Sequence, residues 1–280
     1  MSATADRIDQ VRAEGRAALV AYLPVGFPTV AESVRAVHTL VDNGVDILEL
    51  GLPYSDPVMD GETIQHAVTQ ALLAGARVRD LFPVVEAAAS RGVPVLSMTY
   101  FNPVMRYGVD AFARDLAAAG GAGLITPDLI PDEAGEWIAA ADAHDHDKVF
   151  LVAPSSTDER LALTAAASRG FVYAASTMGV TGERATLGSH AEELVERTRA
   201  AGAERVCVGL GVSRPDQAAQ VARYADGVIV GSAFVRPLLG DGSFDERLEA
   251  MGAVARDLAE GVRSARSVGA ADGALPGSQV

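Results

Sequence analysis

Short apolar runs alternate along most of the chain with longer segments in which apolar residues recur every three or four positions. The runs are rich in Val, Ile and Leu and are bounded by Gly, Pro or polar residues, which is typical of buried β-strands. Eight strands are predicted in this way: Ala18–Pro24, Val45–Gly51, Pro94–Tyr100, Ala122–Thr126, Lys148–Ala153, Phe171–Ser176, Arg205–Gly209 and Gly227–Val230.

The segments between these strands have the spacing of amphipathic helices, as in Val30–Val41, where four apolar residues fall on one side. The same spacing predicts helices over Val78–Ala89, Ala111–Ala119, Glu133–Ala143, Asp158–Ala167, Ala191–Ala200 and Arg214–Ala222. Three further helices are predicted: Asp6–Glu14, which we expect to cover the bottom of a barrel, Gly61–Leu73 after the second strand, and the final helix Phe244–Val262.

This alternation indicates an α/β fold with a parallel sheet covered on both faces. The count of eight strands favours a single-domain (β/α)8 TIM barrel over an open doubly wound sheet. We expect residues 1–266 to form one catalytic barrel domain. Residues 267–280 are rich in Gly, Ala and Ser, and we expect them to be a disordered tail.

The composition argues against several classes of binding partner and of enzyme reaction. The net charge of −14 argues against nucleic acid and anionic membranes, and no apolar run is long enough to span a bilayer. The N-terminus lacks the apolar stretch of a signal peptide, and the single cysteine, Cys207, excludes an internal disulfide, so we expect a cytoplasmic protein. Lys148 is the only lysine and opens a strand, at the wrong end of a parallel barrel for a Schiff-base aldolase.

Candidate chemistry gathers where strands end, because barrel enzymes place their active sites at the carboxyl ends of the strands. Glu49 is the leading general acid/base, since apolar neighbours would raise its pKa; a salt-bridged Glu is the alternative. Asp60, in the loop that follows, is a candidate for binding a substrate N–H or O–H, or is a turn residue before Gly61. Tyr173 either faces the ligand or packs in the core.

Glycines follow the sixth, seventh and eighth strands, in Gly179–Gly182, Gly209–Gly211 and Gly231–Ser232. Barrels often bind phosphate between the loops after strands seven and eight, on backbone N–H groups and the start of a short helix. Ordinary turn glycines are the alternative. The metal-like segment His144–Asp147 falls at the bottom of the barrel, where a solvated turn is expected, so no metal site is predicted.

The segment Leu48–Gly61, continued by Thr63-Ile64-Gln65, resembles the tryptophan synthase alpha subunit family. Further matching motifs occur in family order between about residues 17 and 235: Gly26-Phe27-Pro28, Tyr100-Phe101-Asn102-Pro103, Pro127-Asp128-Leu129, Ser176 through Gly182, Gly209-Leu210-Gly211 and Gly231-Ser232. The resemblance implies retro-aldol cleavage of indole-3-glycerol phosphate to indole and glyceraldehyde 3-phosphate, as part of tryptophan biosynthesis.

The resemblance also implies roles for individual residues. Glu49 would be the acid/base, Asp60 would bind the indole N–H, and Tyr173 would position Glu49 and the substrate. The phosphate would lie on the N–H groups of Gly182, Gly211, Gly231 and Ser232, and the indole pocket would be lined by Tyr22, Met98, Tyr100, Ile125, Leu151 and Leu210. No cofactor is implied for this chain.

The partner implied by the resemblance is a pyridoxal-phosphate-dependent beta subunit, in an alpha2-beta2 complex that receives the indole. Asp56 and Thr181 lie in the loops implied to face it. Met59, Glu62, Thr177 and Met178 depart from the residues common at their positions in the family, all in those loops. A stand-alone lyase that releases free indole and a catalytically silent regulatory barrel therefore stay open as alternatives.

Overall fold

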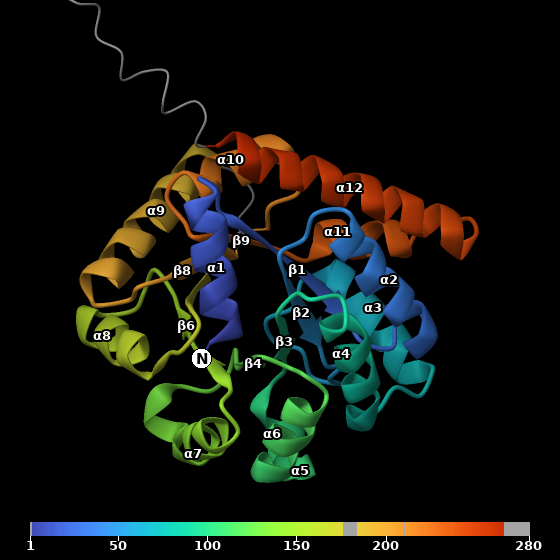
Figure 1. Cartoon of the computed structure of the whole chain (residues 1–280), viewed down its shortest axis with the longest axis horizontal. Helices are drawn as coiled ribbons and strands as arrows, with labels where there is room; N and C mark the ends of the chain where they lie inside the picture. The colour runs from blue at the N-terminus through green and yellow to red at the C-terminus, as the bar shows by residue number, and fades with distance from the viewer. Residues whose placement is uncertain (1, 176–183, 210, 266–280) are drawn as a thin grey trace, which may run out of the picture.

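The computed structural model describes residues 2–175, 184–209 and 211–265, with only the backbone for residues 184–189. Within them, a parallel sheet is surrounded by helices (Figure 1). Its strands are β1 (Ala18–Pro24), β2 (Ile47–Gly51), β3 (Val95–Met98), β4 (Gly123–Ile125), β5 (Asp147–Val149), β6 (Leu151–Val152), β7 (Val172–Ala175), β8 (Val206–Gly209) and β9 (Gly227–Val230).

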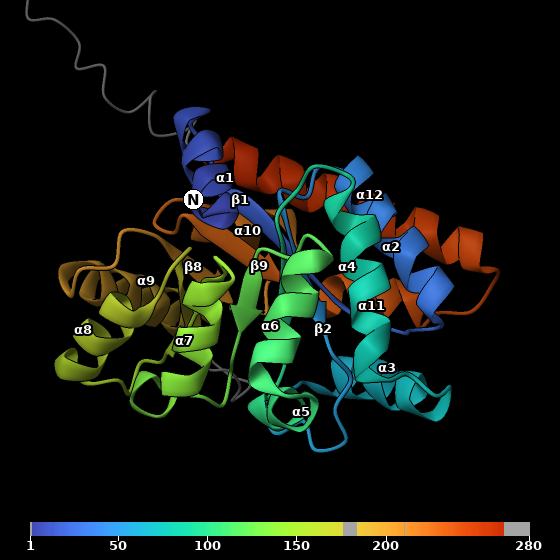
Figure 2. The same ribbon diagram turned by 60° about the horizontal axis from the view of Figure 1, so that its bottom comes forward.

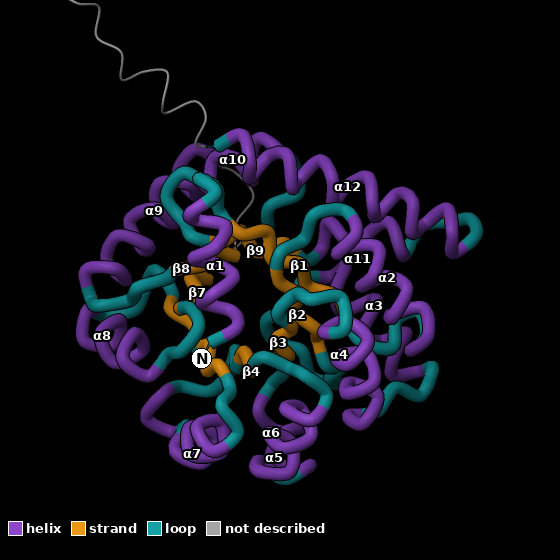
Figure 3. The backbone as a smooth tube through the Cα atoms, viewed as in Figure 1, coloured by secondary structure: helices purple, strands orange, loops and turns teal. Residues whose placement is uncertain are grey.

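The sheet is a nearly closed barrel. Its strand order is β5-β4-β3-β2-β1-β9-β8-β7-β6, so its two ends, β5 and β6, are neighbours in the chain and are separated only by Phe150. Figure 3 shows the strands gathered inside a ring of helices. The predicted (β/α)8 TIM barrel is confirmed. The predicted strand Lys148–Ala153 is divided, because β5 pairs only with β4 and β6 only with β7, and several other strands are shorter at their ends than predicted.

The helices connect the strands on the outside of the barrel. They are α1 (Ala3–Ala13), α2 (Val30–Asp42), α3 (Glu62–Leu73), α4 (Leu81–Ala89), α5 (Phe101–Tyr107), α6 (Val109–Ala118), α7 (Gly135–Ala143), α8 (Asp158–Ala167), α9 (Arg184–Ala200), α10 (Pro215–Ala222), α11 (Ser232–Leu238) and α12 (Phe244–Ser264), with short 3-10 turns at Val78–Asp80 and Pro131–Glu133.

Two helices differ from the sequence-based expectation. Helix α9 begins at Arg184 rather than Ala191, and α5 was not predicted at all. Helix α5 is only seven residues long, too short to show a periodicity. Its start is fixed by a distant group, because the Asp128 carboxylate accepts the Phe101 N–H at 2.9 and 3.2 Å.

Helix α1 closes the bottom of the barrel, as the sequence predicted. Its residues Ile8 and Val11 are fully buried in a cluster with the inward-facing side chains of the strands, such as Val20 and Ile47. Figure 2 shows α1 at one end of the barrel and α3 and α5 at the other. Since all strands run in the same direction, their carboxyl ends open at the end away from α1.

The helices of the described residues are too short or too polar to cross a membrane. Thr177, Met178, Thr181, Gly182, Leu210 and the predicted tail over residues 267–280 lie outside the described residues. The domain boundary at residue 266 stays a prediction.

Candidate active site at the carboxyl ends of the strands

A cavity of about 460 Å³ lies at the carboxyl ends of the strands. Glu49 and Asp60 are the only charged side chains in its described lining. Nine residues singled out from the sequence contribute to that lining: Tyr22, Glu49, Asp60, Met98, Leu151, Tyr173, Gly211, Gly231 and Ser232. They come from strands and loops all around the barrel, so only closure of the sheet brings them together.

Glu49 points into the barrel from β2, opposite Tyr22 of β1 in the strand register. The residue is only 1% exposed, and among the described residues its Oε2 has no hydrogen-bond partner. Burial, followed by the nearby charge of Asp60, raises the pKa of Glu49 to about 8. Among the described residues no cation pairs with Glu49, as the salt-bridged alternative would require, and Glu49 is protonated at neutral pH and able to give up its proton.

Asp60 reaches the same cavity from the loop after β2. It is partly buried, and burial raises the pKa of its carboxyl. Its charge acts on both Glu49 and Tyr22. Two carboxyl groups thus face one cavity, and their surroundings differ. Such a pair allows one carboxyl to act as an acid while the other, as a carboxylate, stabilises positive charge on a ligand.

Two tyrosines lie beside Glu49, and each lies across a glycine of the neighbouring strand. A Cβ atom at Gly51 would lie 2.2 Å from the Tyr22 hydroxyl oxygen, and one at Gly209 would lie 2.4 Å from that of Tyr173. Any larger residue at these glycines would displace the rings. Burial and then the charge of Glu49 raise the pKa of Tyr173 well above its usual value, so its hydroxyl stays protonated.

Glycines and Ser232, without a charged side chain, form the side of the cavity that follows β8 and β9. Gly209 ends β8 and Gly211 comes shortly after it, whereas Gly231 follows β9 and Ser232 begins α11. Gly211 has φ +66°, a conformation that favours glycine. The strand order places β1, with Tyr22, between this side and Glu49.

Some predicted pocket residues lie elsewhere. Ile125 is buried in the layer of side chains inside the barrel, and Tyr100, whose hydroxyl accepts the Met59 N–H, is not among the residues that line the cavity. Asp56 is exposed and accepts a hydrogen bond from the Ser55 hydroxyl at 2.6 Å. Sequence reasoning missed Ile229 and Ala175, although both continue the inward alternation of their strands.

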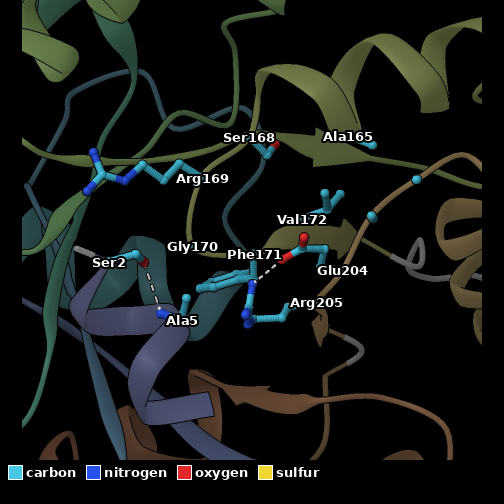
Figure 4. Close-up of a pocket in the computed structure, with 12 residues that line it drawn as sticks. Ser2, Ala5, Ala165, Ser168, Arg169, Gly170, Phe171, Val172, Glu204 and Arg205 are labelled. Carbon is cyan, nitrogen blue, oxygen red and sulfur yellow. Dashed lines mark hydrogen bonds and ion pairs between the residues drawn. The ribbon is translucent and has the colours of Figure 1, made fainter. Parts of the chain in front are cut away.

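A second cavity, of about 300 Å³, lies at the opposite end of the barrel, beside the start of α1 (Figure 4). It contains charged side chains, but these are already engaged: Arg205 pairs with Asp9 and Glu204, and Arg169 pairs with Asp145. His144 and His146 lie near this end, where His144 pairs with Asp110 and His146 contacts the Ala113 carbonyl. Among the described residues, no cluster of His, Cys, Asp or Glu is arranged to hold a metal.

Comparison with known proteins agrees with this geometry. The family model described as tryptophan synthase alpha chain matches residues 8–263. The alpha chain of Mycobacterium ulcerans (strain Agy99) is 60% identical over 259 residues, covering 92% of this chain and 94% of the relative. That of Thermobifida fusca (strain YX) is 56% identical over 262 residues, covering 92% and 97%.

Solved structures extend the likeness to three dimensions. A structure of Mycobacterium tuberculosis tryptophan synthase has 58% sequence identity and a TM-score of 0.86, covering 93% of this chain and 98% of that chain. An alpha subunit from Legionella pneumophila, at 29% identity, still has a TM-score of 0.85 over 94% of this chain and 99% of that chain. With matching motifs, the same barrel and high identity over nearly the full length, the chain belongs to the tryptophan synthase alpha chain family.

Proposed function

We propose that the cavity around Glu49 is where this chain, a carbon–carbon lyase of tryptophan biosynthesis, cleaves indole-3-glycerol phosphate. The observation that carries the proposal is Glu49 itself: a buried carboxyl with a free oxygen and a pKa of about 8, facing a cavity. In the reaction the bond between indole C3 and the glycerol phosphate side chain breaks. C3 gains a proton, the adjacent hydroxyl loses one, and the products are indole and glyceraldehyde 3-phosphate.

Glu49 has the properties needed for both proton transfers. Protonated at neutral pH, it donates to C3, and the carboxylate that remains then accepts the proton of the hydroxyl next to the breaking bond. Its poor solvation favours the neutral form and keeps the carboxylate basic. Tyr173 is proposed to position Glu49 and the substrate, since both groups face the same cavity.

Asp60 is proposed to bind the indole N–H. Protonation of C3 leaves positive charge on the ring, and a carboxylate beside the nitrogen stabilises that charge. The indole would contact Tyr22, Met98 and Leu151, which line the cavity. No cofactor is needed in this scheme, because a carboxyl moves the protons and the substrate itself accepts the electron pair of the broken bond.

The phosphate is proposed to bind at the glycine side of the cavity, on the N–H groups of Gly211, Gly231 and Ser232, together with Gly182 outside the described residues. The N–H groups at the start of α11 and the absence of a Cβ at the glycines suit an anion there. The negative charges of Glu49 and Asp60 belong to β2 and the loop that follows it, which β1 separates from β9 in the strand order, and this favours one orientation of the substrate.

The partner is proposed to be a tryptophan synthase beta chain, which carries pyridoxal phosphate, in a cytoplasmic alpha2-beta2 complex. Large apolar side chains are exposed in the segments after β2, β3 and β4: Val58 (82%), Met59 (45%), Met105 (53%) and Ile130 (41%). These segments follow the carboxyl ends of their strands, the end at which indole is released. Exposed apolar groups gathered at one end of a protein favour a partner surface.

Steady-state release of indole from indole-3-glycerol phosphate tests the proposal, with and without a beta chain. We expect indole formation that the beta chain accelerates and that Glu49→Gln lowers by at least about 100-fold. Rapid indole release that the beta chain leaves unchanged would favour a stand-alone lyase. No indole from the folded wild-type protein, with or without beta, would overturn the proposal and favour a regulatory barrel.

A further inference from the structure

The main chain around Asp60 is held by side chains from two other elements. The Tyr100 hydroxyl, just after β3, accepts the N–H of Met59 at 2.8 Å. The Gln65 side chain in α3 donates its amide N–H to the carbonyl of Asp60 at 2.7 Å. The first bond holds the Val58–Met59 peptide group, one residue before Asp60, and the second holds the Asp60–Gly61 peptide group, so the main chain is restrained on both sides of Asp60.

The rest of this loop has few such restraints. Among the described residues, no other main-chain N–H between residues 54 and 60 donates a hydrogen bond. Val58, next to Met59, is 82% exposed and therefore adds little packing. The placement of Asp60 in the cavity thus depends strongly on the bond to Tyr100.

Tyr100 is itself a rigid anchor. It is only 6% exposed, and its ring packs on that of Tyr54 with centroids 5.1 Å apart and planes tilted by 31°. Asn102 donates to the Tyr54 hydroxyl at 3.2 Å, and the next residue, Phe101, is bound through its N–H to the Asp128 carboxylate. The loop after β2 is therefore attached to the loops after β3 and β4.

We propose that Tyr100 is a positioning residue whose hydroxyl, by accepting the Met59 N–H, sets where the Asp60 carboxylate lies relative to the substrate nitrogen. The inference rests on the proposed function, because it uses the role of Asp60 at the indole N–H. This role is distinct from the predicted contact of Tyr100 with indole, which stays a prediction; Met98 lines the cavity, and Tyr100 acts on it through Met59. The two groups are close: after burial, the charge of Asp60 contributes to raising the pKa of Tyr100.

This role predicts a particular kinetic pattern. Asp60 acts most strongly on charge that develops only as C3 is protonated, so a misplaced Asp60 weakens the transition state more than the bound substrate. The phosphate side of the cavity is formed by other strands and is unaffected. Loss of the Tyr100 hydroxyl should therefore lower kcat and leave KM nearly unchanged.

Tyr100→Phe is the direct test, because it removes the hydroxyl and keeps the ring that packs on Tyr54. We expect kcat for indole formation to fall roughly tenfold, the size of one lost hydrogen bond, with KM within about twofold. The matched control is Tyr107→Phe, which removes a phenol hydroxyl that donates to Asp115 away from the cavity lining and should leave both constants within about twofold.

A double-mutant cycle with Asp60 separates positioning from a general structural effect. If Tyr100 acts through Asp60, Tyr100→Phe should change kcat by less than about twofold in the Asp60→Asn background. Equal effects in both backgrounds, an unchanged kcat in the single variant, or a raised KM with normal kcat would each overturn the inference. Should Tyr100→Phe fail to fold, Gln65→Met, which removes the other bond, is expected to lower kcat about threefold, and an unchanged kcat would count against the inference.

The wild type and Glu49→Gln, measured in the same assay, keep the two proposals distinguishable. No indole from the folded wild type would mean that the proposed function has failed. An active wild type and an inactive Glu49→Gln, together with a Tyr100→Phe variant equal to the wild type, would leave the function intact and reject only the role of Tyr100.

Discussion

Glu49 is an ionisable group in surroundings that oppose its ionisation. It is buried inside the barrel, next to the charge of Asp60, and lacks a cationic partner among the described residues. The folded protein therefore holds a proton that the unfolded chain would release at neutral pH. This costs folding stability, and the same property is what makes the carboxyl useful as an acid.

This trade-off predicts opposite effects of Glu49→Gln on stability and activity. Because the pKa of Glu49 is raised from 4.5 to about 8, its contribution to stability is complete below pH 4.5 and is lost as the pH rises to about 8. The variant, which cannot ionise, should exceed the wild type in stability by up to about 5 kcal/mol above pH 8, with a smaller difference toward pH 5.

Denaturant unfolding of both proteins across this pH range measures that difference. The variant should at the same time lose indole formation. A stability difference that does not change with pH would show that Glu49 has an ordinary pKa in the folded protein.

Helix α1 is attached to the bottom of the barrel by ion pairs to residues just before three strands. Arg7 pairs with Asp46 before β2, Arg12 with Asp226 before β9, and Asp9 with Arg205 before β8. Asp46 is 2% exposed and also binds Arg16 and accepts the Leu19 N–H at 3.0 Å. The helix thus seals the inner apolar layer on which the cavity rests.

Asp46→Ala should destabilise the fold by about 3 kcal/mol, because it leaves the buried Leu19 N–H without its acceptor and removes the buried carboxylate that pairs with Arg7 and Arg16. Urea unfolding checks this. Asp216→Ala, which removes an exposed pair with Arg214, is the control and should leave the midpoint unchanged. Since Asp46 lies at the end opposite to the cavity, kcat of the folded variant should stay within about twofold of the wild type, and a large loss would argue against this separation.

The two ends of the barrel differ in the side chains that they expose. Helix α1 covers one end of the barrel (Figure 2), where ion pairs hold it to the strands. The carboxyl ends of the strands instead carry the cavity around Glu49 and the exposed apolar residues. A partner bound over those residues would also cover the loop that contains Asp60. Association and catalysis are then coupled through one segment of chain.

Met105→Asp places a charge on this face, in α5, without touching the cavity lining. We expect its affinity for a beta chain to fall at least about tenfold, since burial of one Met side chain is worth about 1.5–3 kcal/mol, with an unchanged rate of indole formation by the alpha chain alone. Titration of one chain with the other measures the affinity. Leu163→Asp, on the outer helix α8, is the matched control. Equal affinities for the two variants would place the partner elsewhere.

Sequence alone determined the strand–helix alternation, the barrel, and the placement of Glu49, Asp60 and Tyr173 at the carboxyl ends of the strands. These follow from local periodicity and from the rule that parallel strands share one functional edge. The glycines after β8 and β9 were recognised for the same reason. Their side-by-side position needed no knowledge of contacts.

Tertiary structure decided what depends on contacts between residues far apart in the chain. Three features depend on such contacts and cannot be predicted from local sequence patterns. They are the division of one strand at Phe150, the start of α5 at the Asp128 carboxylate, and the packing of two tyrosines against Gly51 and Gly209. Tyr100 is the clearest case. Its place after a strand predicts an indole contact, whereas its bond to Met59 could not be predicted, because only closure of the barrel brings the loop after β2 against its hydroxyl.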